Sequence, residues 1–244
     1  MDATQAVFYC DKNYPVGNYH FTLGGKIYAF TAIDIMLQGS QLFLNWDRNL
    51  MNVYHHEYAT QVYLQPLVTT VEEAPENSTE LTPTNLSEYT LGGCNKYLIS
   101  PLKKWLNSEG ESWWTPASIY SRRHYKINEK GFLYDVEREF LNVIGAVKKQ
   151  THEEGENKIT DERFFILSAM ESGVSTMYGE GKPYSYLDSD EKRQKTFDGT
   201  PVRWWLRTPI VVDKNYNWTV NTNGKLNHNM CNSEIGVCAV CCVV

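Results

Sequence analysis

The stretch TPVRWWLRTPIVVDKNYNWTVNTNGKLNHNMC, residues 200–231, joins a rigid aromatic strand to an unusually polar segment. Two adjacent tryptophans, Trp204 and Trp205, lie between arginines, and Pro209 ends the apolar run. Ten of the positions that follow are Asn, Lys, Asp or His. An active site, a binding surface and a structural core would each account for this composition differently, so the rest of the sequence must distinguish them.

The length and composition of the chain bound its class. Its 244 residues suit one large domain with a sizeable core, or one domain with a small appendage. The 42% hydrophobic and 21% charged residues exclude a wholly disordered protein. The net charge of −6, without a basic block longer than two lysines, argues against a nucleic-acid partner. No apolar run approaches the ~18 residues of a membrane span, and the start MDATQAVFYCDKNYP lacks the features of a signal peptide. We therefore expect a protein that stays in the cytosol where it is made, or is released by lysis.

The cysteines indicate buried, reduced thiols. Their spacing does not match a structural zinc site. The run CAVCC at 238–242 lies among valines with a period of two, which predicts a buried strand that uses Cys as a small apolar residue. Adjacent strand residues face opposite sides, so we do not expect Cys241 and Cys242 to act as one site. The remaining cysteines are Cys10, Cys94 and Cys231.

Aromatic residues make up 13% of the chain and accompany short β-like runs, which favours a loop-rich α+β or mostly β fold. Alternation on both sides of a Gly-Gly pair predicts a hairpin over 18–33, and QLFLNW predicts a short strand over 41–46. Residues from about 59 to 95 are rich in Thr, Glu, Pro and Asn with little periodicity. This composition predicts a long surface excursion or linker.

The pattern predicts two helices. The first covers 100–107, with Ser100 as its cap and Pro101 at the first helical position. Its apolar face comprises Leu102, Trp105 and Leu106. The second covers 135–149, with Asp135 as its cap, acidic residues in the first turn and lysines in the last. Its apolar face comprises Val136, Phe140, Val143, Ile144 and Val147.

Strands follow the helices. We predict a buried strand over 163–168, a polar hairpin with its turn at 221–224 and a terminal strand over 235–244. No internal repeat is present. The economical interpretation is one domain with its helices early and its strands late.

The motifs ISPLKKWLNS, WWTPASIY, GFLYDVEREFLNVIGAVKK, DERFFILSAMESG and RWWLRTP, followed by VNTNG and IGVCAVC, occur here in that order. This set resembles a family of domains found in gut Firmicutes and their prophages, over residues 92–244. The segment from WWTPASIY to GFLYDVEREFLNVIG resembles members that lie in prophage structural regions. The family is similar in fold to C-type lectin-like domains and to the formylglycine-generating-enzyme group. One departure is GVCAVC, which stands where many members carry GVRPA.

The resemblance implies an α+β, C-type-lectin-like fold: two helices, a twisted antiparallel sheet with long loops, and paired N- and C-terminal strands. Residues 1–90 would supply the first strands and an assembly segment, and 91–244 the lectin-like core of one continuous domain. The segment RWWLRTP would be a central strand. Its alternation then sets Trp204 and Leu206 on one face, and Arg203, Trp205 and Arg207 on the other.

The resemblance also implies that the segment after Pro209 is an exposed ligand face, because this C-terminal region is the variable one in retroelement-diversified relatives. Tyr, Trp and Asn supply rigid contact area and adaptable hydrogen bonds, as binding surfaces require. Simple turn chemistry is the alternative for each Asn. The predicted ligand-binding residues are Asn215, Tyr216, Trp218, Asn221, Asn223, Lys225, Asn227, His228 and Asn229.

Five residues are predicted to be structural. A buried arginine in a strand needs a carboxylate, and we expect Glu171 to pair with Arg207. The other three are Trp105, Trp204 and Trp205.

These features favour a non-enzymatic binding protein without cofactor or metal. The calcium motif of true lectins is missing, since NWD at 45–47 lies too early in the chain. The two adjacent histidines at 55–56 are more typical of a loop than of a pair of metal or catalytic ligands. The expected protein is a virion component of a phage or prophage, made in the host cytoplasm: a capsid decoration protein, head fibre or tail fibre. Its expected partners are a host-surface glycan or protein and other virion proteins, with a second copy of the chain as an open alternative. The competing hypotheses are a bacterial surface or cytosolic binding protein of the same fold, and a cysteine-dependent oxidase-like enzyme.

Overall fold

The structure, a computed structural model, describes residues 9–10, 17–23, 26–47, 50–66, 91, 94–112, 130–197 and 199–243. Short helices and mostly antiparallel sheets make up this part of the chain, so the predicted α+β class is confirmed at this level. Within the described residues, no helix is long and apolar enough to cross a membrane.

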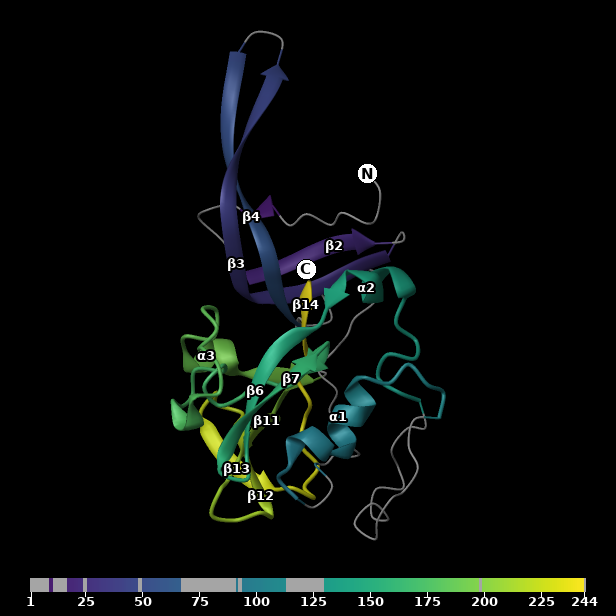
Figure 1. Cartoon of the computed structure of the whole chain (residues 1–244), viewed down its shortest axis with the longest axis vertical. Helices are drawn as coiled ribbons and strands as arrows, with labels where there is room; N and C mark the ends of the chain where they lie inside the picture. The colour runs from purple at the N-terminus through teal and green to yellow at the C-terminus, as the bar shows by residue number, and fades with distance from the viewer. Residues whose placement is uncertain are drawn as a thin grey trace.

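The largest sheet has the order β2-β3-β4-β14-β5. Its N-terminal strands are β2 (Gly17–Leu23), β3 (Lys26–Asp47) and β4 (Leu50–Pro66), and β1 (Tyr9–Cys10) pairs with β4. The predicted hairpin over 18–33 is confirmed as β2 and the start of β3, whereas the strand over 41–46 is part of β3. Beyond their contact with the body, β3 and β4 continue as a two-stranded ribbon (Figure 1).

Part of the predicted excursion over 59–95 is wrong, because β4 continues to Pro66. The β-branched and aromatic residues of TQVYLQP favour a strand up to that proline. Most of the remainder of the excursion, 67–90, lies outside the described residues, as does WWTPASIY.

The C-terminal strand β14 (Val240–Val243) is central to this sheet. It pairs antiparallel with β4, with Cys241 opposite Leu64, and also with β5 (Ile144–Gly145) and β8 (Phe164–Phe165). The predicted pairing of the chain ends is therefore corrected, since the partner of the last strand is β4 rather than the first strand. All four residues of β14 are buried, as expected for a strand covered on both faces.

The first predicted helix is confirmed as α1 (Pro101–Leu106), which follows the one-turn helix η1 (Tyr97–Ile99). The Ser100 hydroxyl accepts a hydrogen bond from the Lys103 amide at 3.1 Å, and Pro101 occupies the first turn. Trp105 is only 3% exposed and packs edge-on against Phe132. The helix thus buries the face that the sequence predicts.

The second predicted helix is wrong beyond Val143. Helix α2 (Arg138–Val143) ends there, and the chain continues as β5 and then as β6 (Val147–Glu153), which pairs with β7 (Glu156–Glu162). Asp135 does not cap the helix, because Glu137 occupies the N-cap position without a side-chain bond. Gly145 and the β-branched residues around it weaken a helix here, while the alternating burial of β6 suits a strand.

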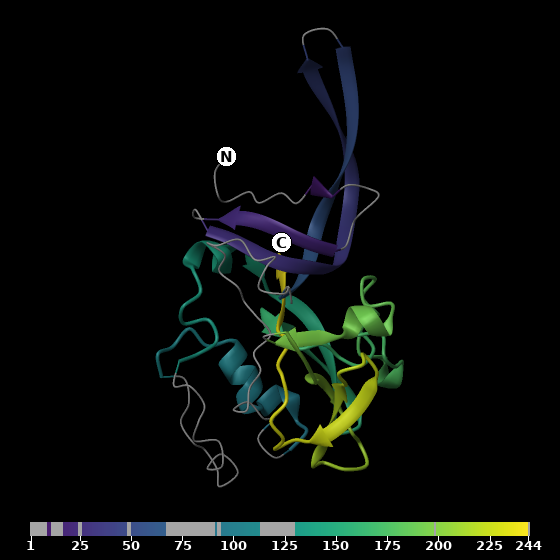
Figure 2. The ribbon, with the colours of Figure 1, turned by 180° about the vertical axis from the view of Figure 1, so that it is seen from behind.

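The remaining elements belong to the body, on the opposite side of the sheet from the tip of the ribbon (Figures 1 and 2). A three-stranded antiparallel sheet joins β11 (Trp204–Pro209), β12 (Tyr216–Val220) and β13 (Leu226–Met230). Beside it lie η3 (Met177–Gly179), α3 (Asp190–Arg193), β9 (Lys195–Phe197) and β10 (Thr200–Val202). The predicted turn is confirmed, since the Gly224 amide donates to the Asn221 carbonyl at 2.9 Å. The predicted strand over 163–168 is buried at 164–168 but is regular only as β8.

Strand β11 separates two hydrophobic clusters. Trp204 and Leu206 belong to one and Trp205 to the other, in line with the predicted alternation. Cys242 and Cys241 are divided in the same way. The rigid aromatic strand is thus the middle of the core, and its C-terminal end leads directly into the segment predicted to bind ligand.

Candidate ligand-binding surface

A buried ion network lies along β11. The Arg207 side chain is fully buried, and its Nη1 lies 2.5 Å from Oε2 of Glu171, which is 1% exposed. This is the pair that the sequence predicts. Glu171 also accepts an ion pair from Lys149 on β6, with Oε1 and Nζ 2.6 Å apart. Burial raises the pKa of Glu171, but the charges of Arg207 and Lys149 outweigh burial and hold that pKa below its ordinary value.

Lys149 occupies an aromatic cage that the sequence did not reveal. Its ammonium lies 4.4 Å from the ring centroid of Phe165, 5.1 Å from that of Tyr63 and 5.2 Å from that of Tyr184. It also donates to the Tyr184 hydroxyl at 2.6 Å. Burial lowers the pKa of Lys149, while Glu171 opposes that shift. The cation–π contacts and the ion pair together offset the cost of burying this charge.

A second buried carboxylate, Glu180, ties the end of β6 to the end of β11. It accepts hydrogen bonds from the His152 amide at 2.7 Å and from the Thr208 hydroxyl. Burial raises the pKa of this carboxyl above its ordinary value. Arg207 adds a further link, because its Nη2 donates to the Gln150 carbonyl at 3.0 Å. The two strand ends are therefore fixed relative to each other.

The loop after β11 is held by one buried amide. Nδ2 of Asn95 lies 2.8 Å from the carbonyl oxygen of Ile210, 3.2 Å from that of Asp213 and 3.1 Å from that of Tyr216. The Asn95 backbone amide also donates to the Lys214 carbonyl. We call residues 209–216 the Asn95 loop. These bonds fix its backbone although Val212 at its tip is 94% exposed.

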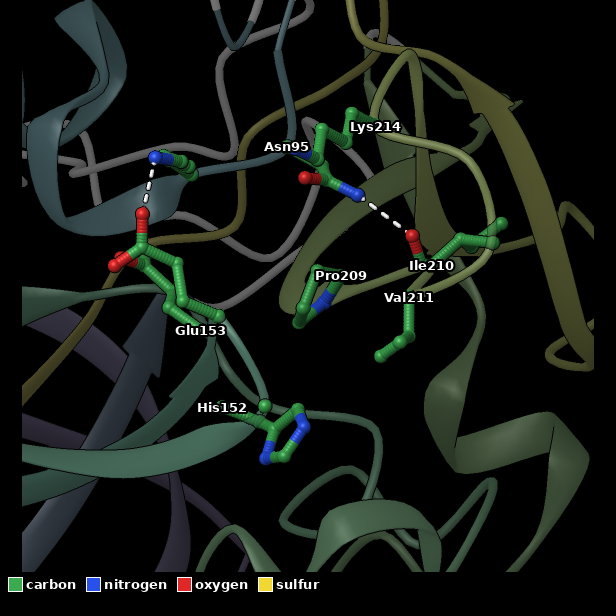
Figure 3. A pocket seen from close by; sticks show the side chains of 10 residues that line it. Asn95, His152, Glu153, Pro209, Ile210, Val211 and Lys214 are labelled. Carbon is green, nitrogen blue, oxygen red and sulfur yellow. Dashed lines mark hydrogen bonds and ion pairs between the residues drawn. The ribbon is translucent and has the colours of Figure 1, made fainter.

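A pocket of about 380 Å³ lies between the Asn95 loop and the β6–β7 turn (Figure 3). Residues 152–155 form one wall, 209–211 form the other, and Asn95, Lys96 and Lys214 complete it. Protein pockets for small ligands span roughly 300–1,000 Å³, so this one has room for a small group. The first wall is polar and the second is apolar.

The polar wall is shaped by a tight turn. Glu154 and Gly155 have positive φ values of 58° and 85°, as a two-residue hairpin turn of type I′ requires. The Glu154 carboxylate binds Lys96 and, at 2.9 Å, Lys158. Hydrogen bonds from these two lysines lower the pKa of Glu154 to about 2. His152 stacks on Tyr178, with ring centroids 4.3 Å apart.

On the other flank of the Asn95 loop, three predicted ligand residues meet. Tyr216 and Trp218 lie on one face of the β12–β13 hairpin, where His228 is opposite Trp218 and Met230 is opposite Tyr216. The ring of His228 lies 5.7 Å from that of Tyr216 and 5.9 Å from that of Trp218, both edge-on. We call these four residues the aromatic face. Tyr216 and Trp218 are half-buried and His228 is exposed.

The other predicted ligand residues are not part of this face. Asn227 and Asn229 are paired with Thr219 and Asn217, on the opposite side of the hairpin. Asn221 and Asn223 make turn bonds, accepting from the Thr222 and Lys225 amides at 2.9 and 3.2 Å. Nζ of Lys225 lies 3.9 Å from Oδ2 of Asp190. Asn215 is exposed at the end of the Asn95 loop, where its carbonyl accepts from Cys231.

Three of the buried thiols, Cys231, Cys238 and Cys241, are poor candidates for nucleophiles. Burial raises the pKa of Cys231 to about 12 and that of Cys238 to about 11, and it also raises the pKa of Cys241. We expect iodoacetamide at pH 8 to leave these three unmodified in the folded protein and to modify the half-buried Cys94. Peptide mass spectrometry before and after unfolding reads the result. Rapid labelling of Cys238 or Cys241 in the folded protein would contradict this assignment.

Comparison with known proteins identifies a family. No curated protein and no solved structure matches the chain. Residues 84–244, about two thirds of the chain, match a family described as a domain of unknown function, DUF6273. The match includes α1, β11, the Asn95 loop and the aromatic face. This chain therefore belongs to the DUF6273 family.

Proposed function

We propose that this chain is a non-enzymatic ligand-binding domain, of C-type-lectin-like fold, in a virion protein of a phage or prophage. It binds a host-surface glycan or protein through the Asn95 loop and its two flanks. The observation that carries the proposal is the loop itself. Its backbone is fixed by Asn95, with a pocket on one side and the aromatic face on the other.

The composition of this surface supports binding. Val211 and Val212 are 50% and 94% exposed at the loop tip, and Met230 on the aromatic face is 44% exposed. Apolar and aromatic side chains rimmed by polar groups are typical of interface centres. A loop that is ordered before binding loses little conformational entropy when a ligand arrives. The surface is therefore suited to specific attachment.

The ribbon of β3 and β4 supports the assignment to a larger assembly. A two-stranded hairpin is only marginally stable by itself in water. The ribbon extends beyond the body (Figure 1), which suits contact with another virion protein or a second copy of the chain. Mass spectrometry of purified particles tests this part: detection of the chain supports the virion assignment, and a chain found only at the bacterial surface favours the competing hypothesis.

An array of host-cell glycans and surface proteins tests the binding site. We expect Val211→Lys to weaken binding by about tenfold or more, because a charge on the apolar wall must be desolvated. Ile159→Lys is the matched control, since Ile159 is 66% exposed on β7 and lies outside the pocket. Both variants should keep the melting temperature of the parent, as surface changes usually do. Parental binding by Val211→Lys would remove the Asn95 loop from the site.

A further inference from the structure

The pocket contains a carboxylate with no cation at ion-pair distance among the described residues. Glu153 is 4% exposed and lines the polar wall. Its Oε1 accepts a hydrogen bond from the Leu98 amide at 2.8 Å. Its charge is felt by two lysines, because together with Glu154 it helps to raise the pKa of Lys96 and that of Lys158. A charge-assisted bond to Oε2 is therefore open to a cationic ligand in the pocket.

The lysines near Glu153 make their direct ion pairs with another carboxylate or lie at the rim. Lys96 and Lys158 both bind Glu154, and Glu153 acts on them only at longer range. Lys214 is exposed at the mouth of the pocket, where water screens its charge. The chain as a whole carries a net charge of −6, which also favours a basic ligand.

The opposite wall suits an alkyl stem. Pro209, Ile210 and Val211 present apolar surface across the pocket from Glu153 (Figure 3). Long basic side chains bury their methylene groups on such surface and leave the charged end for a polar partner. The pocket is less suited to a sugar, which would stack on an aromatic ring. His152 is the one aromatic ring among the described residues that line the pocket, and Tyr178 already stacks on it.

We propose that this pocket binds the side chain of an arginine or lysine of a protein partner, with the cation at Glu153 and the stem against 209–211. This inference rests on the proposed function and assigns its ligand to the protein class. Lys214 at the rim donates to a carbonyl or carboxylate oxygen of the same partner. The carboxylate selects the charge, and the apolar wall selects the length of the side chain.

Amide chemical shifts of the full chain, titrated with Nα-acetyl-arginine amide and Nα-acetyl-lysine amide, test the inference. We expect shifts at 152–155 and 209–214. The citrulline analogue has nearly the same shape without the charge, and it should bind about tenfold more weakly or worse. Glu153→Gln keeps an acceptor for the Leu98 amide, and it should bind the arginine and lysine probes more weakly by the same factor. Glu156→Gln, on the same hairpin but outside the pocket, is the matched control and should bind like the parent.

Three outcomes overturn the inference. They are equal binding of citrulline and arginine, parental affinity in Glu153→Gln, and no shift in the pocket with either basic probe. Methyl glycosides that shift these amides when the basic probes do not would assign the pocket to glycans and leave the proposed function standing. Failure of the proposed function itself is separate, because it is read from Val211→Lys on the array.

Discussion

Replacing Glu171 with alanine is expected to lower the free energy of unfolding by about 3–5 kcal/mol, the usual cost of breaking a buried ion pair from one side. The change leaves two buried cations, Arg207 and Lys149, without the carboxylate that lies 2.5 and 2.6 Å from them. Urea denaturation of parent and variant measures the loss. If the variant is too unstable to purify, Glu171→Gln, which retains the shape and one acceptor, gives a smaller loss of the same sign.

Glu154→Ala is the matched control for this experiment. Glu154 also binds two cations, Lys96 and Lys158, but it is exposed on the β6–β7 turn. Exposed ion pairs contribute little to stability because water and salt screen them, so Glu154→Ala should unfold at nearly the parental urea concentration. Equal losses in the two variants would contradict a structural role for the buried network.

Trp205→Ala is expected to cost about 3–5 kcal/mol, as large-to-small changes of buried aromatic residues do. Trp205 is 0% exposed, lies in the middle of β11 and packs in the cluster that includes α1. For a chain of this size the loss corresponds to a melting temperature lower by roughly 6–20 °C. Trp218→Ala, a change at a half-buried tryptophan, should cost less. Melting of Trp205→Ala within a degree or two of the parent would show that Trp205 is not a core residue.

Local signals in the sequence were sufficient for part of the fold. A cap and a proline predict α1, and a turn sequence predicts the β12–β13 hairpin. The family resemblance predicts β11 as a strand, and alternation predicts which of its residues share a face. The Arg207–Glu171 pair was predictable because a buried arginine requires a carboxylate. Each of these features depends on a few neighbouring residues or on one strong energetic requirement.

Features set by distant contacts were not predictable in this way. The segment after Val143 has an apolar pattern that fits a helix or a strand, and the pairing of β5 with β14 and of β6 with β7 decides it. The sequence pattern therefore places Lys149 at a helix end rather than in the ion network. No local pattern identifies the roles of Asn95 and Glu180, because their partners Ile210 and Thr208 lie 115 and 28 residues away.

The candidate site likewise combines features that the local sequence predicts with features that depend on distant contacts. The polar composition after Pro209 predicts a ligand-binding segment there, but spacing alone does not separate turn residues from surface residues. The register of β12 and β13 places Tyr216, Trp218 and His228 together, and it turns Asn227 and Asn229 to the other side. The pocket beside the loop joins segments around residues 95, 153 and 210, which no single motif connects.

The central claim is that the Asn95 loop and its two flanks bind the ligand. Hydrogen–deuterium exchange of the full chain, with and without a target captured on the array, tests it most directly. We expect slower exchange on binding in peptides that cover 150–156 and 208–218, and unchanged exchange in β9 and β10. Protection confined to other segments, such as the β3–β4 ribbon, with none in these two, would contradict the claim.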